Sequence, residues 1–212
     1  LLYTEEYDEP AVKICPKGTE GEIIELGGLL ICLPQRPKEE DISGYKKSND
    51  MQMWERSPMP KELSRIKSMD EWAEMPREGF WFYNNGTPTY ITGRHYMMLQ
   101  WTKLDIGYPY FLNFQREIYL HMAACEVDTR CIGQLYTKCR RSGYTNICSS
   151  VLVDEATQVK DKLMGIQSKT GKDAQENIFM KKVVYMFRNY PFFFKPIQDG
   201  TTNPRMELAF RE

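Results

Sequence analysis

A short stretch near the middle of the chain limits its possible folds more than any other feature. Residues 138–145 read K-C-R-R-S-G-Y-T, which is close to the phosphate-binding loop G-x-x-x-x-G-K-[ST]. In such loops backbone N–H groups surround the phosphates, a lysine neutralises them, and a Ser or Thr hydroxyl binds Mg²⁺. Gly143 and Thr145 occupy these places, but Tyr144 fills the lysine position and is neutral at pH 7. The positive charge must therefore come from Lys138, Arg140 or Arg141.

The flanking residues predict a strand at 132–138 and a helix at 146–160. A strand, a glycine turn and a helix N-terminus form an anion site, because the free N–H groups and the positive dipole end point to one place. Gln134 and Thr137 interrupt the apolar run that is usual in a central parallel strand. The residues alone leave two interpretations open, a nucleotide-binding loop and a structural turn.

Composition restricts the class of protein. A chain of 212 residues with 42% hydrophobic residues suits one domain, or one domain with an appendage. Its net charge of −1 excludes a protein that coats nucleic acid through overall basic charge. Because no apolar run approaches the ~20 residues of a membrane span and no leader opens the chain, we expect a soluble, unsecreted protein. The first residue is Leu1, so we expect a piece of a longer protein.

The six cysteines contain no C-x-x-C pair, and only two histidines could join them. This pattern favours reduced thiols in a cytosolic compartment over a zinc site.

The N-terminal part alternates short apolar runs with turn residues. Runs at 11–15, 22–26 and 29–33 predict a small β-meander, and residues 34–50 predict a linker or mobile arm. Spacings of three predict an amphipathic helix at 61–75. An Asn-Gly step between aromatic runs predicts a hairpin at 79–92, whose aromatics we assign to a core or interface rather than to base stacking.

From residue 105 the pattern changes to alternating helices and strands. Helices are predicted at 114–127, 146–160 and 171–188, strands at 132–138 and 163–168, and further strand and turn at 191–210. This order predicts an α/β fold with a parallel sheet whose ligand lies at the strand C-termini. We therefore expect two parts, a β-rich N-terminal region (1–104) and the first half of an α/β domain (105–212).

Residues 151–156, V-L-V-D-E-A, imitate the strand that carries the Mg²⁺-binding Asp and catalytic Glu of many ATPases. Asp154 comes only nine positions after Thr145, and the helix after the loop needs all of them. Asp154 and Glu155 are therefore expected on or near that helix's surface, about 13 Å along its axis from the loop. No comparable segment follows, so we expect the hydrolytic carboxylates of an NTPase beyond Glu212.

With these residues identified, the chain resembles the N-terminal part of a large terminase subunit, the DNA-packaging ATPase of tailed bacteriophages. One subgroup of that family has a loop with Lys at the start and Gly-Tyr-Ser/Thr at the end, as here. Residues 108–115, Y-P-Y-F-L-N-F-Q, resemble its adenine-recognising Q motif, and residues 163–170 with Ala174 resemble its second strand and following helix. Residues 80–101 resemble terminases of crAss-like phages in their overall sequence character, without a shared motif. The family's acidic pair, coupling motif and nuclease domain are absent.

The resemblance implies an incomplete P-loop NTPase fold of the ASCE/RecA-like type, with helices on both faces of its parallel sheet. It implies ATP and Mg²⁺ as cofactors, with Gln115 reading adenine, Lys138 neutralising phosphate, Thr145 binding the metal, and Arg140 or Arg141 stabilising the transition state. The cofactor-binding residues are then Gln115, Lys138, Cys139, Arg140, Arg141, Ser142, Gly143, Tyr144 and Thr145.

The same resemblance implies translocation of double-stranded DNA by a homo-oligomeric ring docked on the procapsid in the host cytoplasm. Portal protein and the small terminase subunit are its implied partners, no membrane is involved, and the 212 residues alone should be inactive. Two alternatives remain, a superfamily-2-like helicase or translocase and a non-catalytic scaffold with a degenerate loop. Lysines near the second predicted strand are interleaved with acids, which favours a solvated mixed-charge face over a DNA site.

Overall fold

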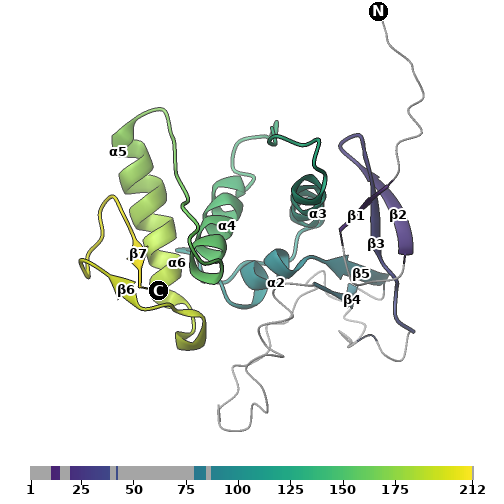
Figure 1. Ribbon diagram of the computed structural model, residues 1–212, viewed down its shortest axis with the longest axis horizontal. Helices are drawn as coiled ribbons and strands as arrows, with labels where there is room; N and C mark the ends of the chain where they lie inside the picture. The colour runs from purple at the N-terminus through teal and green to yellow at the C-terminus, as the bar shows by residue number, and fades with distance from the viewer. Residues whose placement is uncertain (1–10, 15–19, 39–41, 43–78, 85–86, 212) are drawn as a thin grey trace, which may run out of the picture.

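The computed structural model describes residues 11–14, 20–38, 42, 79–84 and 87–211. An N-terminal sheet, helices α3 and α4, and a long C-terminal helix follow one another across the molecule (Figure 1). The predicted helix at 61–75 and most of the predicted linker lie outside the described residues.

The N-terminal sheet contains the three predicted strands, but it is not a meander. Strands β1 (Val12–Lys13), β2 (Glu20–Leu26) and β3 (Leu29–Pro34) lie in the order β1-β3-β2. The β2–β3 pair is antiparallel, and Gly27 and Gly28 form its turn with φ angles of 59° and 81°. β1 pairs with β3 in parallel, so β3 lies between β1 and β2 in the sheet. The apolar runs predicted the strands, but their order depends on pairing between segments that are not neighbours in sequence.

The predicted hairpin is confirmed. Strands β4 (Phe80–Asn84) and β5 (Thr87–Ile91) are antiparallel, with Trp81 opposite Tyr90. Alternate side chains enter different cores: Trp81 and Tyr90 pack with the N-terminal sheet, whereas Phe82 packs in the main core. These buried rings confirm the assignment of the hairpin aromatics to a core.

The three helices predicted after residue 105 are present, together with α2, which the sequence did not predict. α2 (Gly93–Gln100) follows the hairpin, with the Thr92 hydroxyl accepting a hydrogen bond from the His95 amide as its N-cap. α3 (Asn113–Val127) covers its predicted range, and α4 (Tyr144–Gln158) begins and ends two residues before the predicted 146–160. α5 (Gly171–Asp173), η2 (Ala174–Val184, π-helical) and α6 (Tyr185–Asn189) together form one long helix.

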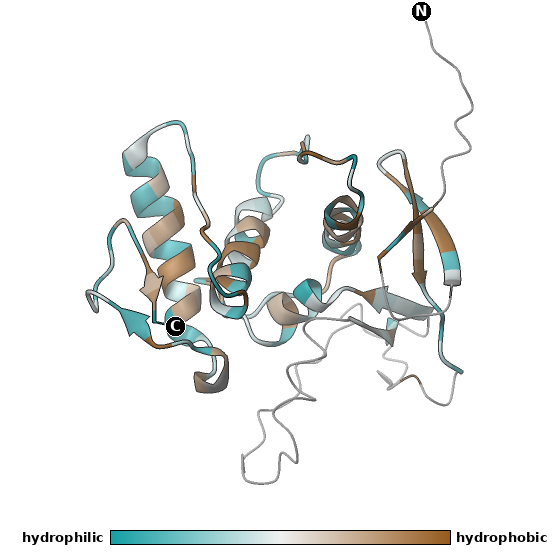
Figure 2. Cartoon of the chain, viewed as in Figure 1, coloured by the Kyte–Doolittle hydropathy of each residue, from teal (hydrophilic) through white to brown (hydrophobic). Residues whose placement is uncertain are grey.

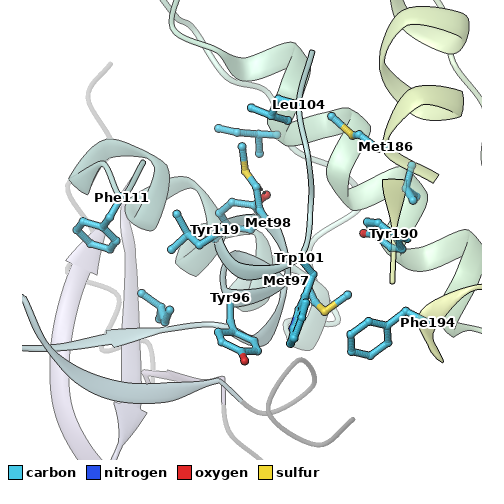
Figure 3. Packing of buried hydrophobic residues seen from close by; sticks show 14 of the residues in the cluster. Tyr96, Met97, Met98, Trp101, Leu104, Phe111, Tyr119, Met186, Tyr190 and Phe194 are labelled. Carbon is cyan, nitrogen blue, oxygen red and sulfur yellow. Dashed lines mark hydrogen bonds between the residues drawn. The ribbon is translucent and has the colours of Figure 1, made fainter. Parts of the chain in front are cut away.

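The main core lies between α2, α3, α4 and the C-terminal helix. Met97, Met98 and Trp101 lie at its centre, and the Trp101 ring is 5.7 Å from that of Phe194 (Figure 3). Side chains from both sides of residue 104 build this core and also the smaller one under the N-terminal sheet.

The two strands predicted at 132–138 and 163–168 are not formed. Both segments have no regular secondary structure, and the sheets in the described chain are one of three strands and two of two strands, none of them a parallel P-loop sheet. Ile132, Leu135 and Leu163 are almost fully exposed, and Figure 2 colours parts of the connections on either side of α4 as hydrophobic. A strand needs a hydrogen-bonding partner, and none lies beside these segments in the described chain.

The segment 132–138, called here the incoming segment, runs along α3 instead. The Gln134 amide donates to the carbonyl of Met122 (3.3 Å), and the Tyr136 hydroxyl donates to that of Ile118 (3.4 Å). Side-chain contacts with a helix therefore replace the backbone ladder of a sheet.

The C-terminal region ends in short elements, as predicted. A 3-10 turn, η3 (Phe192–Phe194), precedes the two-residue strands β6 (Gln198–Asp199) and β7 (Ala209–Phe210), which pair beside the long helix (Figure 1). No helix in the described part of the chain has the length and apolar character needed to cross a bilayer.

Candidate anion-binding site

The loop before α4 has the backbone geometry of an anion site. Arg141 and Gly143 both have positive φ angles, 66° and 74°, and Gly143 is the residue directly before the helix. Glycine tolerates this left-handed conformation without the steric cost of a Cβ atom. The loop thus turns sharply into α4, and its first helical N–H groups face the turn.

The first turn of α4 contains backbone N–H groups that are not used in backbone hydrogen bonds among the described residues. The Gly143 carbonyl accepts from the amides of Asn146 (2.8 Å) and Ile147 (3.3 Å). In the described chain the N–H groups of Gly143, Tyr144 and Thr145 donate no backbone hydrogen bond. Three adjacent free donors at the positive end of a 15-residue helix favour an anionic ligand.

Three cations lie at the same loop. Lys138, Arg140 and Arg141 are exposed, and within the described residues none of them has an ion-pair partner. Cys139 and Thr145 are also exposed. Exposed, unpaired cations beside free N–H donors give the loop a positive character that suits phosphate.

The Tyr144 side chain packs against neighbouring side chains and does not face the loop as a charged group. Its ring lies 5.3 Å from the Tyr136 ring, and its phenol and the Cys148 thiol are close enough to influence each other's pKa. Burial, with a smaller contribution from Cys148, raises the pKa of Tyr144 above its ordinary value, so the phenol stays neutral. The side chain in the lysine position therefore holds the incoming segment against α4 and adds no charge to the loop.

Gln115 lies beside the loop, as the sequence interpretation requires. It is 6% exposed, and a Cβ atom on Gly143 would lie 3.8 Å from its Nε2. Its Oε1 and the buried Oγ of Ser142 have no hydrogen-bond partner in the described chain. Two unpartnered polar atoms under one turn are costly unless a ligand or water completes them.

The Asp-Glu pair is on a helix, but its predicted exposure is wrong. Asp154 and Glu155 belong to α4, which confirms that they do not follow a strand. They are only 8% and 9% exposed, because α4 packs on α2 and on the C-terminal helix. Glu155 pairs with Arg94, and Lys162 lies 3.4 Å from it.

Burial changes the protonation of Asp154. Desolvation raises its pKa to about 7, Arg94 opposes the shift, and Glu126 adds to it. Neither acid is therefore placed as a metal ligand at the loop. Arg94 was missed by the sequence reasoning, because a single arginine in an otherwise buried helix has no spacing pattern that predicts its partners.

The described residues contain no group of three or more His, Cys, Asp or Glu side chains that could hold a metal ion. The exposed Thr145 hydroxyl fits Mg²⁺ only as one ligand among phosphate oxygens and waters, which is how this ion is usually held at nucleotides. The free donors, loop cations and unpartnered amide fit the phosphates and base of a nucleotide.

Cys148 is a second residue that sequence reasoning missed. It lies one turn after Tyr144, close enough to Lys138 for that cation to favour its thiolate, although burial raises the pKa of its thiol overall. The i, i+4 spacing of Tyr144 and Cys148 on the predicted helix could have revealed their contact.

The lysines near residues 160–182 form a mixed-charge face, as predicted. Lys162, Lys172 and Lys182 lie 3.4–4.0 Å from the acids Glu155, Glu176 and Asp105. Pairing of this kind leaves no uniformly basic stripe for DNA in this part of the chain.

In comparisons with protein-family models, curated proteins and solved structures, the chain matches none of them. The function must therefore be inferred from the residues at the start of α4.

Proposed function

We propose that the loop at 138–145 binds the phosphates of ATP with Mg²⁺. The proposal rests on unsatisfied polar groups that gather at one turn. The N–H groups of Gly143–Thr145 donate no backbone hydrogen bond, and Oε1 of Gln115 and Oγ of Ser142 have no partner in the described chain. A purely structural turn would leave these groups unsatisfied without benefit.

Each residue at the loop has a distinct role in this proposal. The N–H groups of residues 143–145 donate to phosphate oxygens, and Lys138 places its ammonium against their charge. Thr145 presents its hydroxyl to Mg²⁺. Arg140 or Arg141 stabilises charge that develops during phosphoryl transfer.

Within the proposal, hydrolysis needs groups that the loop lacks. A metal-holding acid and a residue that orients water must join the phosphate cradle. Asp154 and Glu155 are buried and engaged with α2, so they do not supply these functions. We therefore propose that the 212 residues bind nucleotide without turning it over.

For the whole protein we retain the ATPase of a DNA-packaging motor. The support is the loop sequence and the proximity of Gln115 to Gly143, a spacing of elements that the terminase resemblance implies. Double-stranded DNA, portal protein and the small terminase subunit are the partners under this proposal, with a homo-oligomeric ring on the procapsid. The expected parallel sheet would require the incoming segment and residues 163–168 to gain strand partners.

A non-catalytic scaffold is the second candidate, and the engagement of Tyr144 with Tyr136 and Cys148 favours it. Titration with Mg-ATP separates the two candidates. A scaffold would show no saturable binding, whereas the proposed loop should bind ATP and ADP and release both on chelation of Mg²⁺ or at high salt.

Replacing Lys138 by alanine should weaken Mg-ATP binding about 10- to 100-fold, the range of one charge-assisted hydrogen bond. Isothermal titration calorimetry measures the change. Lys172→Ala is the matched control, because this exposed lysine pairs with Glu176 away from the loop. Unchanged affinity in Lys138→Ala, together with loss of binding in Arg141→Ala, would assign the phosphate charge to the arginine.

Replacing Gln115 by alanine should reduce the preference for ATP over GTP more than it reduces triphosphate affinity. An amide can donate and accept at one base edge, which is how adenine is distinguished. Competition of ATP and GTP for the protein measures this preference, with Gln158→Ala on the far end of α4 as the control amide. Equal losses for both nucleotides would show that Gln115 supports Gly143 and does not read the base.

A further inference from the structure

A cluster of thiols lies where α3 meets the incoming segment. Cys125 is on the last turns of α3 and is buried, whereas Cys131 is half-buried and directly precedes the incoming segment. Both thiols are free, and the chain runs back along α3 from Cys131, because Gln134 and Tyr136 bond to the carbonyls of Met122 and Ile118. Cys131 is also among the groups that act on the Cys125 thiol, so the two thiols are neighbours, six residues apart in sequence, that a disulfide can join.

A tight turn sets this contact. The carboxylate of Asp128 accepts from the backbone amide of Arg130 (3.0 Å) and from its guanidinium (2.8 and 2.9 Å). The Cys131 amide donates to the Asp128 carbonyl (3.0 Å). These bonds reverse the chain after α3, so that Cys131 returns to the helix beside Cys125.

The neighbours of the thiols suit proton and thiol exchange. Nδ1 of His121 lies 3.6 Å from the Sγ of Cys125 and 2.8 Å from the hydroxyl of Tyr136. The Cys131 thiol is directed at the Gly133 carbonyl (3.3 Å) and is the more exposed of the two. Burial, followed by contact with Cys131, raises the pKa of Cys125 to about 11. Cys131 is therefore the thiol that meets an external reagent first.

We infer that Cys125 and Cys131 form a reversible, redox-sensitive disulfide that fixes the start of the incoming segment on α3. The oxidant is a small-molecule disulfide. The Cys131 thiolate attacks one of its sulfurs, breaking that S–S bond and releasing one small thiolate. His121 Nδ1–H donates to the Tyr136 hydroxyl, so Cys125 gives its proton to Nε2 of His121 (3.9 Å) and attacks the Cys131 sulfur, which releases the second small thiolate. Two protein thiols are oxidised, one external disulfide is reduced to two thiols, and the two protons pass to these products.

The consequence lies in the segment that leads into the loop. Among the described residues, the hydrogen bonds that hold the incoming segment on α3 in the reduced protein come from the side chains of Gln134 and Tyr136. A covalent link at residue 131 removes the states in which the segment leaves the helix, and it closes a short chain loop. Oxidation should therefore slow amide exchange in residues 132–137 and raise Tm by about 5 °C.

The test oxidises the full chain with glutathione disulfide and maps the products by mass spectrometry. The expected result is a loss of two mass units in one peptide pair joining residues 125 and 131, reversed by dithiothreitol, with slower exchange at 132–137. Cys131→Ser should lose both effects, whereas Cys139→Ser and Cys148→Ser should keep them. A disulfide that instead joins Cys131 to Cys148, or a stable mixed disulfide without ring closure, would overturn the inference. Cys125→Ser provides an independent check, because it should stop the reaction at the mixed disulfide on Cys131.

Discussion

Replacing Arg94 by methionine should lower the free energy of unfolding by about 3 kcal/mol, the order of the loss when a buried ion pair loses one partner. Arg94 lies on α2 and joins two other helices, with one guanidinium nitrogen on Glu126 of α3 and another on Glu155 of α4. The Glu155 side chain is 10% exposed, so its charge would remain buried. Lys162, 3.4 Å away and half-exposed, compensates only in part. Methionine keeps the aliphatic packing, so the loss reports the charge. Urea unfolding at pH 7 measures it.

Two variants isolate the part of this effect that is due to Glu155. Glu126→Gln should cost less than about 1 kcal/mol, because the Glu126 side chain is 51% exposed and exposed pairs contribute little. The double variant Arg94→Met with Glu155→Gln should recover most of the lost stability, since no buried charge is then left unpaired. If the single and double variants are equally unstable, the loss comes from packing of α2 and not from the ion pair.

Asp154→Asn should remove a contribution that makes the protein less stable as the pH rises from 5 to 8 and that opposes the contribution of buried His95, whose pKa burial lowers to about 3. In the folded chain burial raises the pKa of Asp154 from 3.8 to about 7. The folded state thus binds the proton more tightly than the unfolded state, and this stabilisation is complete below pH 3.8 and lost as the pH passes 7. Between pH 5 and 8 the loss is about 2.5 kcal/mol. Denaturant unfolding at several pH values measures the slope.

The groups that face Asp154 give this prediction its control. Arg94 lowers the pKa of Asp154 and Glu126 raises it, while Asp154 itself raises the pKa of the buried hydroxyls of Tyr119 and Tyr190. Asp199 titrates below the tested window, because a hydrogen bond from Arg211 lowers its pKa. Asp199→Asn should therefore keep the wild-type slope between pH 5 and 8. A wild-type slope in Asp154→Asn as well would mean that Asp154 is ionised in the folded protein at pH 5.

Both predictions concern the acids that most resemble a catalytic pair in the sequence. A carboxyl group that is largely protonated below pH 7 is a poor ligand for Mg²⁺, and Glu155 is already neutralised by Arg94. The structural role of these residues supports the proposal that the loop binds nucleotide without the groups needed to hydrolyse it.

The sequence alone determined the elements that depend on local patterns. Helix α4 begins at residue 144 because Gly143 takes a left-handed conformation, and the hairpin forms where two aromatic runs flank an Asn-Gly step. The loop cations and free N–H donors follow from the same local order. The contact of Gln115 with the loop was expected only from the terminase resemblance, and the structure places its amide beside Gly143.

Tertiary structure decided what depends on distant partners. The incoming segment has a strand-like sequence, yet it lies on α3, because a strand forms only where another backbone offers its donors and acceptors. Asp154 and Glu155 are on the predicted helix, but only the packing of α2 against α4 buries them. β1 joins β3 in parallel for the same reason, since register and order follow from pairing across the chain. Local propensity therefore set the helices and turns of this protein, and long-range burial and hydrogen bonding set its sheets and the charges of its core.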